Sequence, residues 1–158
     1  MRPAPAGRAR YVGIALIALL AVGVALVTQH VYGMQPCPWC VLQRLIFVVM
    51  ALAALPAIVV PRRGVRTAST LAIAALAAAG VATSLWQHFV AARSPSCAMT
   101  LADQIMQWTG LGDALPQVFA AYASCADAAV KILGLPYEFY SLALFVVLGD
   151  AALLRRRG

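Results

Sequence analysis

Four long apolar runs constrain the fold of this 158-residue chain more than any other feature. The runs cover residues 11–27, 41–60, 67–90 and 137–154. About 17 to 25 helical residues cross a bilayer core of roughly 30 Å, so each run is long enough, the first and last only just. Lipid offers the backbone no hydrogen-bond partners, which favours helices over open sheet. With 63% hydrophobic and 11% charged residues, the sequence predicts an all-α membrane protein, a four-helix transmembrane bundle forming one domain, 1–158.

The arginines indicate how the predicted spans are oriented. If the chain crosses four times, nine arginines share one side: Arg2, Arg8, Arg10, Arg62, Arg63, Arg66, Arg155, Arg156 and Arg157. Basic residues stay on the cytoplasmic side, so both chain ends are expected in the cytoplasm of a bacterial inner membrane. The loops 28–40 and 91–136 then face the periplasm. The net charge of +7 is therefore a topology signal, and no nucleic-acid partner is expected.

All four cysteines fall in the two outward loops. Cys37 and Cys40 belong to the first loop, and Cys97 and Cys125 to the second. The outward side of such a membrane is oxidising, so an even set of thiols there is expected to form disulfides. Three pairings are possible; proximity favours Cys37 with Cys40, leaving Cys97 with Cys125. As a structural staple, the second pair would contribute about 3 to 4 kcal/mol.

The close pair Cys37 and Cys40 has the features of a redox site. A bond across C-x-x-C restrains little chain, and such pairs are characteristically redox-active. The cysteine spacing fits zinc poorly, and haem attachment requires histidine where Val41 stands, so no metal site is predicted. Cys40 is expected near the start of the second helix, with Arg44 one turn later. The helix dipole and the guanidinium would both favour the Cys40 thiolate.

A redox-active dithiol also needs an electron acceptor. The sequence contains no G-x-G-x-x-G element after a strand and no P-loop, so nucleotide carriers have no evident site. An acceptor dissolved in the bilayer remains. A quinone, either ubiquinone or menaquinone, takes two electrons and two protons, and Arg44 is expected to bind a ring carbonyl.

These features together resemble the disulfide bond formation protein B family, DsbB. The likeness rests on the four runs, on "CPWCVLQR" opening the second, and on the cysteines in "SPSC" and "ASCAD". It implies a quinone reductase that reoxidises DsbA, a soluble periplasmic thiol oxidase with a thioredoxin fold. It also implies that the partner attacks Cys97, whose bond partner is Cys125, that Cys37 relays the electrons, and that Cys40 meets the quinone.

The same resemblance assigns two further residues to the quinone. Arg44 corresponds to the family arginine that supports quinone binding, and His88 in "SLWQHFV" matches a histidine often found near it. An interfacial histidine bonded to solvent or backbone is the alternative for His88. His30, near the end of the first run, carries no comparable expectation.

Two other classes of protein fit part of the sequence. A vitamin K epoxide reductase-like protein also combines four spans, a quinone and C-x-x-C, but its active pair belongs near the last helix. A structural or transport bundle with two inert disulfides is the non-enzymatic alternative. The position of Cys40 at a helix start, with Arg44 one turn on, counts against the inert bundle.

The second outward loop is expected to contain helices. "TLADQIMQWTG" starts with a capping-box pattern at Thr100 and Asp103 and carries an apolar stripe that includes Leu101 and Trp108. This pattern predicts a short amphipathic helix lying on the membrane surface. Residues 117–133, between two prolines, also have helical potential.

Overall fold

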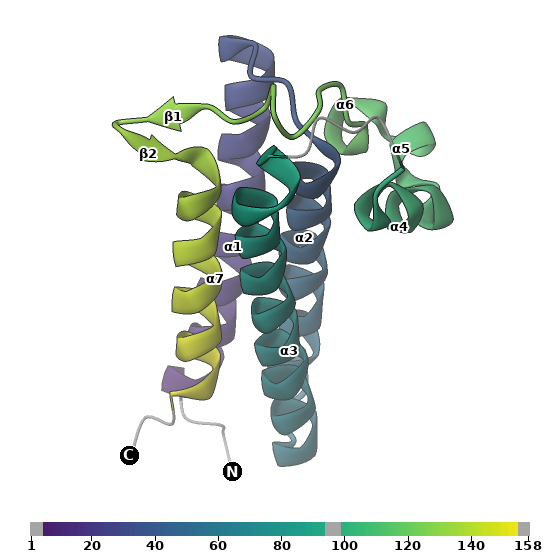
Figure 1. Ribbon diagram of the computed structural model, residues 1–158. Helices are drawn as coiled ribbons and strands as arrows, with labels where there is room; N and C mark the ends of the chain where they lie inside the picture. Colours follow the sequence, from purple (N-terminus) through teal and green to yellow (C-terminus); the bar gives the residue numbers. More distant parts are fainter. Residues whose placement is uncertain (1–4, 94–98, 155–158) are drawn as a thin grey trace.

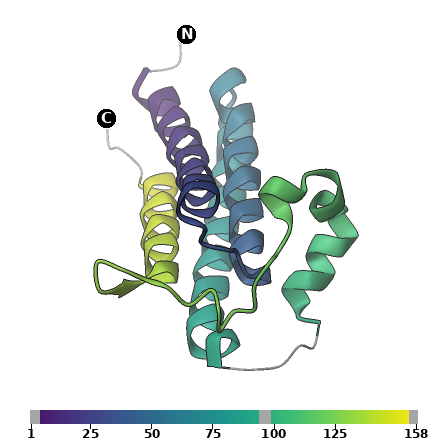
Figure 2. The same ribbon diagram turned by 90° about the horizontal axis from the view of Figure 1, so that it is seen from above.

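The computed structural model describes residues 5–93 and 99–154. The long helices of this part form an elongated bundle (Figure 1): α1 (Pro5–Tyr32), α2 (Pro38–Val59), α3 (Arg63–Phe89) and α7 (Tyr137–Leu153). Seen from above, α2 packs between α1 and α3, and α7 packs against α3 and α1 (Figure 2). Each apolar run of the sequence therefore lies within one of these helices, except for a residue or two at its end.

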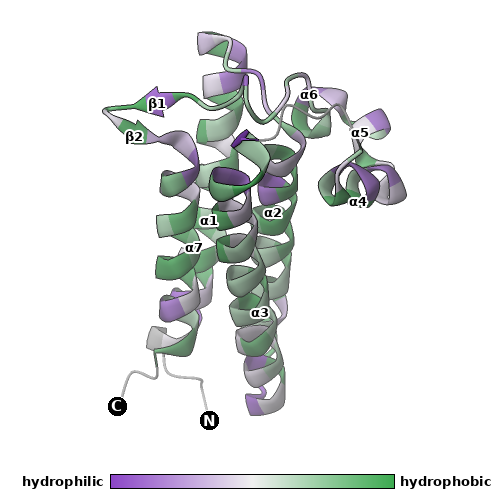
Figure 3. Ribbon diagram, in the orientation of Figure 1, coloured by the Kyte–Doolittle hydropathy of each residue, from purple (hydrophilic) through white to green (hydrophobic). Residues whose placement is uncertain are grey.

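Three helices of the described part are long and apolar enough to cross a membrane, over Gly7–Tyr32, Pro38–Val59 and Arg63–Arg93. Helix α7 has 17 residues, or about 26 Å at 1.5 Å per residue. It therefore falls slightly short of a roughly 30 Å core. Hydrophobic residues cover most of the length of these helices, α7 included (Figure 3). The fourth crossing, at residues 137–154, stays a prediction.

Helix α1 extends well past the predicted run 11–27. No proline or glycine stops it before Gly33, whose φ of +68° lies in the left-handed region that glycine adopts without a steric penalty. The chain turns there, and the Met34 N–H donates to the Thr28 carbonyl over 3.1 Å. The added turn matters for the site because it carries Gln29 into the bundle, where it is buried.

Close packing joins α7 to α2 and α3. The rings of Phe47 and Phe145 stack with their centroids 4.1 Å apart. The Phe145 ring occupies the space beside Gly80, where a Cβ would collide with it. A Cβ on Gly149 would lie 3.0 Å from the Cβ of Ala77. Small residues thus let these helices approach closely, which is how helices associate in lipid, where no hydrophobic force holds them together.

Polar contacts close the end of the bundle where α1 begins and α7 ends. The Tyr11 side chain is buried, and its hydroxyl lies 2.9 Å from Thr70 Oγ1 and donates to the Arg66 carbonyl. Arg10 donates to the Leu154 carbonyl over 2.7 Å, which satisfies a carbonyl at the end of α7. These bonds tie α1 to α3 and α7 at the arginine-rich end.

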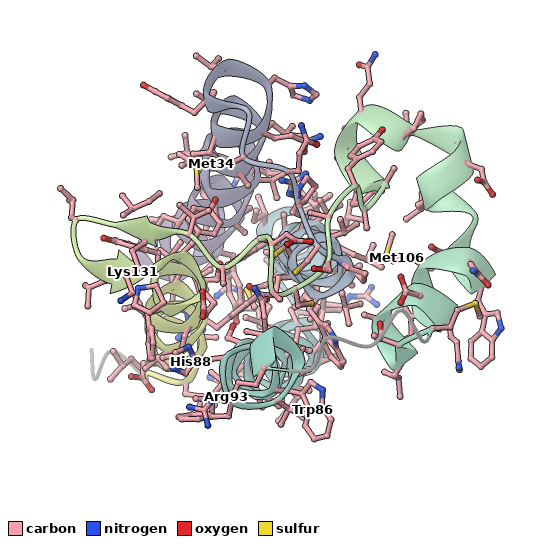
Figure 4. The ribbon with its side chains drawn as sticks, turned by 45° about the horizontal axis from the view of Figure 1, so that its top comes forward. Met34, Trp86, His88, Arg93, Met106 and Lys131 are labelled. Carbon is pink, nitrogen blue, oxygen red and sulfur yellow. The ribbon has the colours of Figure 1, made fainter. Side chains whose placement is uncertain are left out.

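The long loop follows the 3₁₀ turn η1 (Ala91–Arg93) and contains α4 (Leu101–Thr109), α5 (Leu111–Ala114) and α6 (Pro116–Phe119). Helix α4 starts with a complete capping box between Thr100 and Asp103. Its Met106 side chain lies on the side facing the bundle (Figure 4) and packs with Val41 of α2. Two residues of the predicted apolar stripe, Leu101 and Trp108, point elsewhere and are 59% and 85% exposed, whereas its Ile105 is partly buried against the core.

The expectation of a helix over residues 117–133 is wrong beyond Phe119. Beyond Phe119 the N–H groups of Tyr122 and Ala123 donate to the distant Pro36 carbonyl instead of to a helical partner. Ser124 and Asp127 cap only a single turn. A small antiparallel pair follows, β1 (Lys131–Ile132) and β2 (Leu135–Pro136). Its two-residue turn has φ of +51° at Leu133 and +82° at Gly134, the backbone that tight hairpins require.

Candidate functional site

Cys37 is the residue at which helix α2 begins. Its backbone is extended, Pro38 occupies the first helical position, and the Cys37 sulfur accepts a hydrogen bond from the Cys40 N–H over 3.3 Å. Proline suits that position because its fixed φ is helical and its missing N–H would have no partner. A thiol sulfur here does what a serine or aspartate oxygen does at most helix starts. Cys40 therefore lies in the first turn, where the sequence places it.

Three of the predicted cysteines come together at this helix start. The sulfurs of Cys37 and Cys40 lie 2.7 Å apart, and Cys37 also forms a side-chain hydrogen bond with Cys125 of the long loop. The loop is held there because the N–H groups of Tyr122 and Ala123 donate to the Pro36 carbonyl over 3.0 and 3.3 Å. Cys97 lies outside the described residues. Proximity in sequence predicts the pair Cys37–Cys40, whereas the approach of Cys125 follows only from folding.

The hydrogen bond between Cys37 and Cys125 shifts the pKa values of the two thiols in opposite directions. Donation to the sulfurs of Cys125 and Cys40, together with burial, raises the pKa of Cys37. The same bond from Cys37 lowers the pKa of Cys125 against the opposing effect of its own burial, and the Trp39 backbone adds a second bond. In the reduced protein the proton therefore stays on Cys37, and Cys125 is the readier thiolate.

Arg44 is buried one turn after Cys40. Its Nη1 donates to Gln29 Oε1 over 2.6 Å and to the Val118 carbonyl over 3.0 Å, and its Nη2 donates to the Ala25 carbonyl over 3.2 Å. All these acceptors are neutral, and no carboxylate pairs with Arg44 among residues 5–93 and 99–154. A buried cation without a counter-ion is costly, so its charge remains available to an anionic or electron-rich group beside it.

An apolar cavity of about 830 Å³ opens beside Arg44 and Cys40. Its volume lies in the range of roughly 300 to 1,000 Å³ that small-molecule sites occupy. Residues of α1 and α7 form most of the wall, including Ile17, Val24 and Leu144. The polar wall residues on α2, α3 and α7 include Cys40, Gln43, Arg44, Gln87 and Glu138.

A chain of amides reaches the Cys40 sulfur from α3. Gln87 is buried and donates to the Cys40 sulfur over 3.3 Å, while Gln43 donates to Gln87 Oε1 over 2.8 Å. Sequence reasoning missed Gln29, Gln43 and Gln87. For Gln43 and Gln87 the available signal was an amide inside an apolar run, because polar side chains at such depth are expensive and tend to mark sites; Gln29 lies beyond the run 11–27 and carried no such signal.

His88 lies behind the cavity wall. Its Nδ1 is 2.8 Å from Glu138 Oε1, and its ring packs edge-on against Phe89 and Phe139. Figure 4 shows His88 beside α7, below Lys131 in that view. The structure thus places Glu138, rather than His88, at the cavity surface. The sequence analysis assigns Glu138 no role, and the predicted contact of His88 with a quinone stays a prediction.

A helical membrane protein with a cysteine cluster at the end of an apolar cavity is the class that this geometry defines. The profile of the family described as disulfide bond formation protein DsbB matches residues 7–154. Disulfide bond formation protein B of Aromatoleum aromaticum is 32% identical over 96% of this chain and 95% of the relative. That of Herminiimonas arsenicoxydans is 34% identical over 85% of each chain. Disulfide bond formation protein B 1 of Pseudomonas fluorescens is 36% identical over 85% of this chain and 80% of the relative.

The chain belongs to the disulfide bond formation protein B family. The resemblance predicted from "CPWCVLQR" and the loop cysteines is thereby confirmed. Membership in a family of membrane proteins that act in disulfide bond formation is consistent with an oxidoreductase. Membership in this family also argues against the vitamin K epoxide reductase-like interpretation.

Proposed function

We propose that this protein is a protein-disulfide:quinone oxidoreductase that reoxidises a DsbA-like periplasmic thiol oxidase. The observation that carries the proposal is the position of Cys40. Its sulfur is 2.7 Å from Cys37 on one side, and on the other it lines the cavity that contains Arg44. A single sulfur therefore connects the cysteine cluster with a space fit for a lipid-soluble electron acceptor.

The cysteine cluster supports a relay of thiol–disulfide exchanges. The partner thiolate attacks Cys97 of a Cys97–Cys125 disulfide, which releases Cys125 as a thiolate. Cys125 then attacks Cys37 of the Cys37–Cys40 disulfide and releases Cys40 beside the cavity. Each step is an attack of thiolate on sulfur, and a thiol of lowered pKa is the better leaving group. The lowered pKa of Cys125 suits its release in the first step.

The series of exchanges is completed when the partner is released. Its second thiol displaces Cys97 from the mixed disulfide, and the freed Cys97 attacks Cys125 to restore the loop disulfide. Cys37 is released in turn, so the partner has become a disulfide and Cys37 and Cys40 a dithiol. Two electrons have moved from the partner to the helix start, and their removal reforms the Cys37–Cys40 bond.

The cavity residues fit a quinone of the membrane pool. A bound quinone would supply a two-electron, two-proton acceptor beside Cys40. The buried, positively charged Arg44 side chain, which lacks a carboxylate partner in the described chain, would hold a ring carbonyl and favour negative charge on it. The Gln87 amide keeps the Cys40 sulfur in place over 3.3 Å. The apolar wall residues would shield a bound acceptor from water.

The proposed setting is the bacterial inner membrane with four crossings and both termini in the cytoplasm. Helix α7 would be the fourth span, with its exposed Val146 and Val147 against lipid. The described arginines Arg10 and Arg66 lie at the end opposite the cysteines, as the positive-inside rule requires. The exposed Leu101 and Trp108 of α4 would rest on the outer membrane surface.

The test is anaerobic turnover of purified protein with a reduced thioredoxin-fold partner and a soluble quinone, followed by quinone absorbance. Cys40→Ser is expected to stop quinone reduction while the helices stay folded, and Cys97→Ser to abolish turnover of the partner. An inert structural bundle would reduce no quinone, and its cysteines would never form a mixed disulfide with the partner. Wild-type activity that persists in both variants would contradict the proposal.

A further inference from the structure

Glu138 is a buried carboxyl group that the cysteine relay does not use. It lies in the first turn of α7, is only 4% exposed, and lines the cavity that contains Cys40 and Arg44. Its Oε1 is 2.8 Å from His88 Nδ1. Its Oε2 is buried and has no hydrogen-bond partner among the described residues.

An unpartnered carboxylate oxygen at such a site needs a physical explanation. Burial disfavours an ionised carboxylate unless both oxygens find donors, and polar groups left unpaired inside proteins are rare. A proton bound by the carboxyl group removes most of this cost. The position of Glu138 therefore favours a carboxyl group that binds and releases a proton beside the cavity. Its hydrogen-bond partner, His88, lies on the side away from the cavity.

His88 connects this carboxyl group with the surroundings of the protein. Its side chain is 27% exposed, in contrast to the buried Glu138. The rings of Phe89 and Phe139 pack edge-on against it, 4.9 and 4.8 Å away, and hold the imidazole with Nδ1 toward Glu138. Histidine is the side chain that most readily exchanges protons near neutral pH. Proton exchange with water at the exposed edge of the ring can thus reach Glu138.

We propose that His88 and Glu138 form a proton-delivery pair for quinone reduction in the cavity, an inference that rests on the proposed function. Glu138 gives a proton to an oxygen atom of the acceptor and takes a new one at Oε1 from His88 Nδ1. Rotation of the carboxyl group exchanges its two oxygens, so the proton received from His88 turns toward the cavity. His88 recovers its proton from water.

The proton and electron count closes. Oxidation of the Cys37–Cys40 dithiol to a disulfide releases two electrons and two protons, and reduction of a quinone to a quinol consumes two of each. Glu138 supplies one of the protons to one ring oxygen. Cys40 enters this step as a thiolate beside the cavity, so the other ring oxygen takes a second proton from Glu138 after His88 has reloaded it. The proton that Cys40 lost on forming its thiolate and the proton of Cys37, a residue outside the cavity wall, are released, and they balance the two protons that His88 takes up.

Other ionisable groups surround the pair and enter any pH profile. Those that line the cavity are Tyr32 of α1, Cys40 and Arg44 of α2, and Tyr137 and Tyr140 of α7. On the outer side, Arg93 of η1 lies over the Phe89 ring at 5.9 Å from its centroid. None of these described groups is bonded to Glu138, whose hydrogen-bond partner is His88. The variants below therefore change the pair and leave these neighbours in place.

The first experiment compares Glu138→Gln with wild type in quinone binding and quinone reduction. Glutamine keeps the shape of the side chain and a bond to His88 but carries no transferable acid proton. We expect quinone reduction by the pre-reduced protein to slow about a hundredfold, as for the loss of a general acid. Quinone affinity, read by quenching of tryptophan fluorescence, should stay unchanged. Asp113→Asn, an exposed carboxylate on α5, is the matched control with wild-type rates.

The second experiment asks whether the lost step is a proton transfer. The pH profile of the rate should differ between wild type and Glu138→Gln, because the variant can no longer pass a proton from the pair to the acceptor. Small weak acids such as acetic acid should partly restore the Glu138→Gln rate. His88→Asn should slow the reaction in the same direction, because Glu138 then recovers its proton slowly.

A third readout needs neither quinone nor turnover. Infrared difference spectra of quinone-free protein between acidic and alkaline buffer should contain a carboxyl band that Glu138→Gln removes and Asp113→Asn retains. Identical spectra in wild type and Glu138→Gln would overturn the inference. So would an unchanged reduction rate, or a loss of quinone affinity equal to the loss of rate. If wild type itself reduces no quinone, the proposed function fails first, and the two failures are thereby distinguished.

Discussion

The backbone N–H of Cys40 donates to the sulfur of Cys37 over 3.3 Å, so one sulfur of the pair is also the N-cap of helix α2. The C-x-x-C spacing and the helix start are therefore a single geometric feature. Pro38 fixes the backbone between the two sulfurs in its helical conformation. In the proposed relay, exchange at Cys37 would occur at a rigid helix end, which would keep Cys40 directed at the cavity throughout the cycle.

Replacement of Cys37 separates capping from redox chemistry. In a Cys40→Ser background, where the Cys37–Cys40 bond cannot form, Cys37→Ala should lower the free energy of unfolding by about 1 kcal/mol because the cap is lost. Cys37→Ser supplies a hydroxyl oxygen and should keep most of that stability. Denaturant unfolding of the reduced protein in detergent measures both. Equal stabilities of the alanine and serine variants would show that the sulfur does not cap the helix.

Thiolate titration tests the bond between Cys37 and Cys125. In a reduced Cys40→Ser, Cys97→Ser variant, thiolate absorbance should rise in two steps with pH. The first comes from Cys125, because the bond from Cys37 lowers its pKa, and the second from Cys37, whose pKa that bond raises. Replacing Cys37 by alanine removes the donor, so the pKa of Cys125 should move upward. A Cys125 titration that ignores Cys37 is the contrary result.

Replacement of Arg44 by lysine keeps the positive charge but loses the planar guanidinium, which donates hydrogen bonds to Gln29, Ala25 and Val118 at the same time. The loss of one charge-assisted hydrogen bond costs about 1.5 kcal/mol, or roughly tenfold in affinity. The apparent KM for quinone should rise by at least this factor, and partner oxidation at saturating quinone should change much less. Arg63→Lys, at the exposed start of α3, is the matched control. An unaltered KM would remove Arg44 from the quinone site.

Gly80 tests the packing of α3 against α7. A methyl group at this position would collide with the Phe145 ring, so Gly80→Ala should lower the free energy of unfolding by about 1 to 3 kcal/mol, the usual cost of overpacking. Adding Phe145→Leu should recover part of the loss. Gly13→Ala is the control, because a Cβ there meets no described atom within 4 Å; it should be neutral or stabilising. Equal unfolding midpoints in the two alanine variants would argue against the close approach.

Much of the helical framework could be predicted from the sequence because local patterns encode it. An apolar run forms a helix in lipid whatever its neighbours, and the capping pattern at Thr100 fixes the start of α4 from adjacent residues alone. The failure over residues 117–133 has a tertiary cause. Helix α6 ends at Phe119, and the N–H groups of Tyr122 and Ala123 donate to the Pro36 carbonyl, a distant acceptor that local propensity does not reveal.

The sequence by itself determined the long helices, the position of Cys40 near the start of α2, and Arg44 one turn beyond Cys40, since each depends on neighbouring residues. Only the tertiary structure decided which distant residues meet: Cys125 at Cys37, Gln87 at Cys40, and Glu138 at His88. These meetings depend on helix packing and on a long loop folding back to Pro36. Residues far apart in the chain carry no spacing pattern that would predict such contacts.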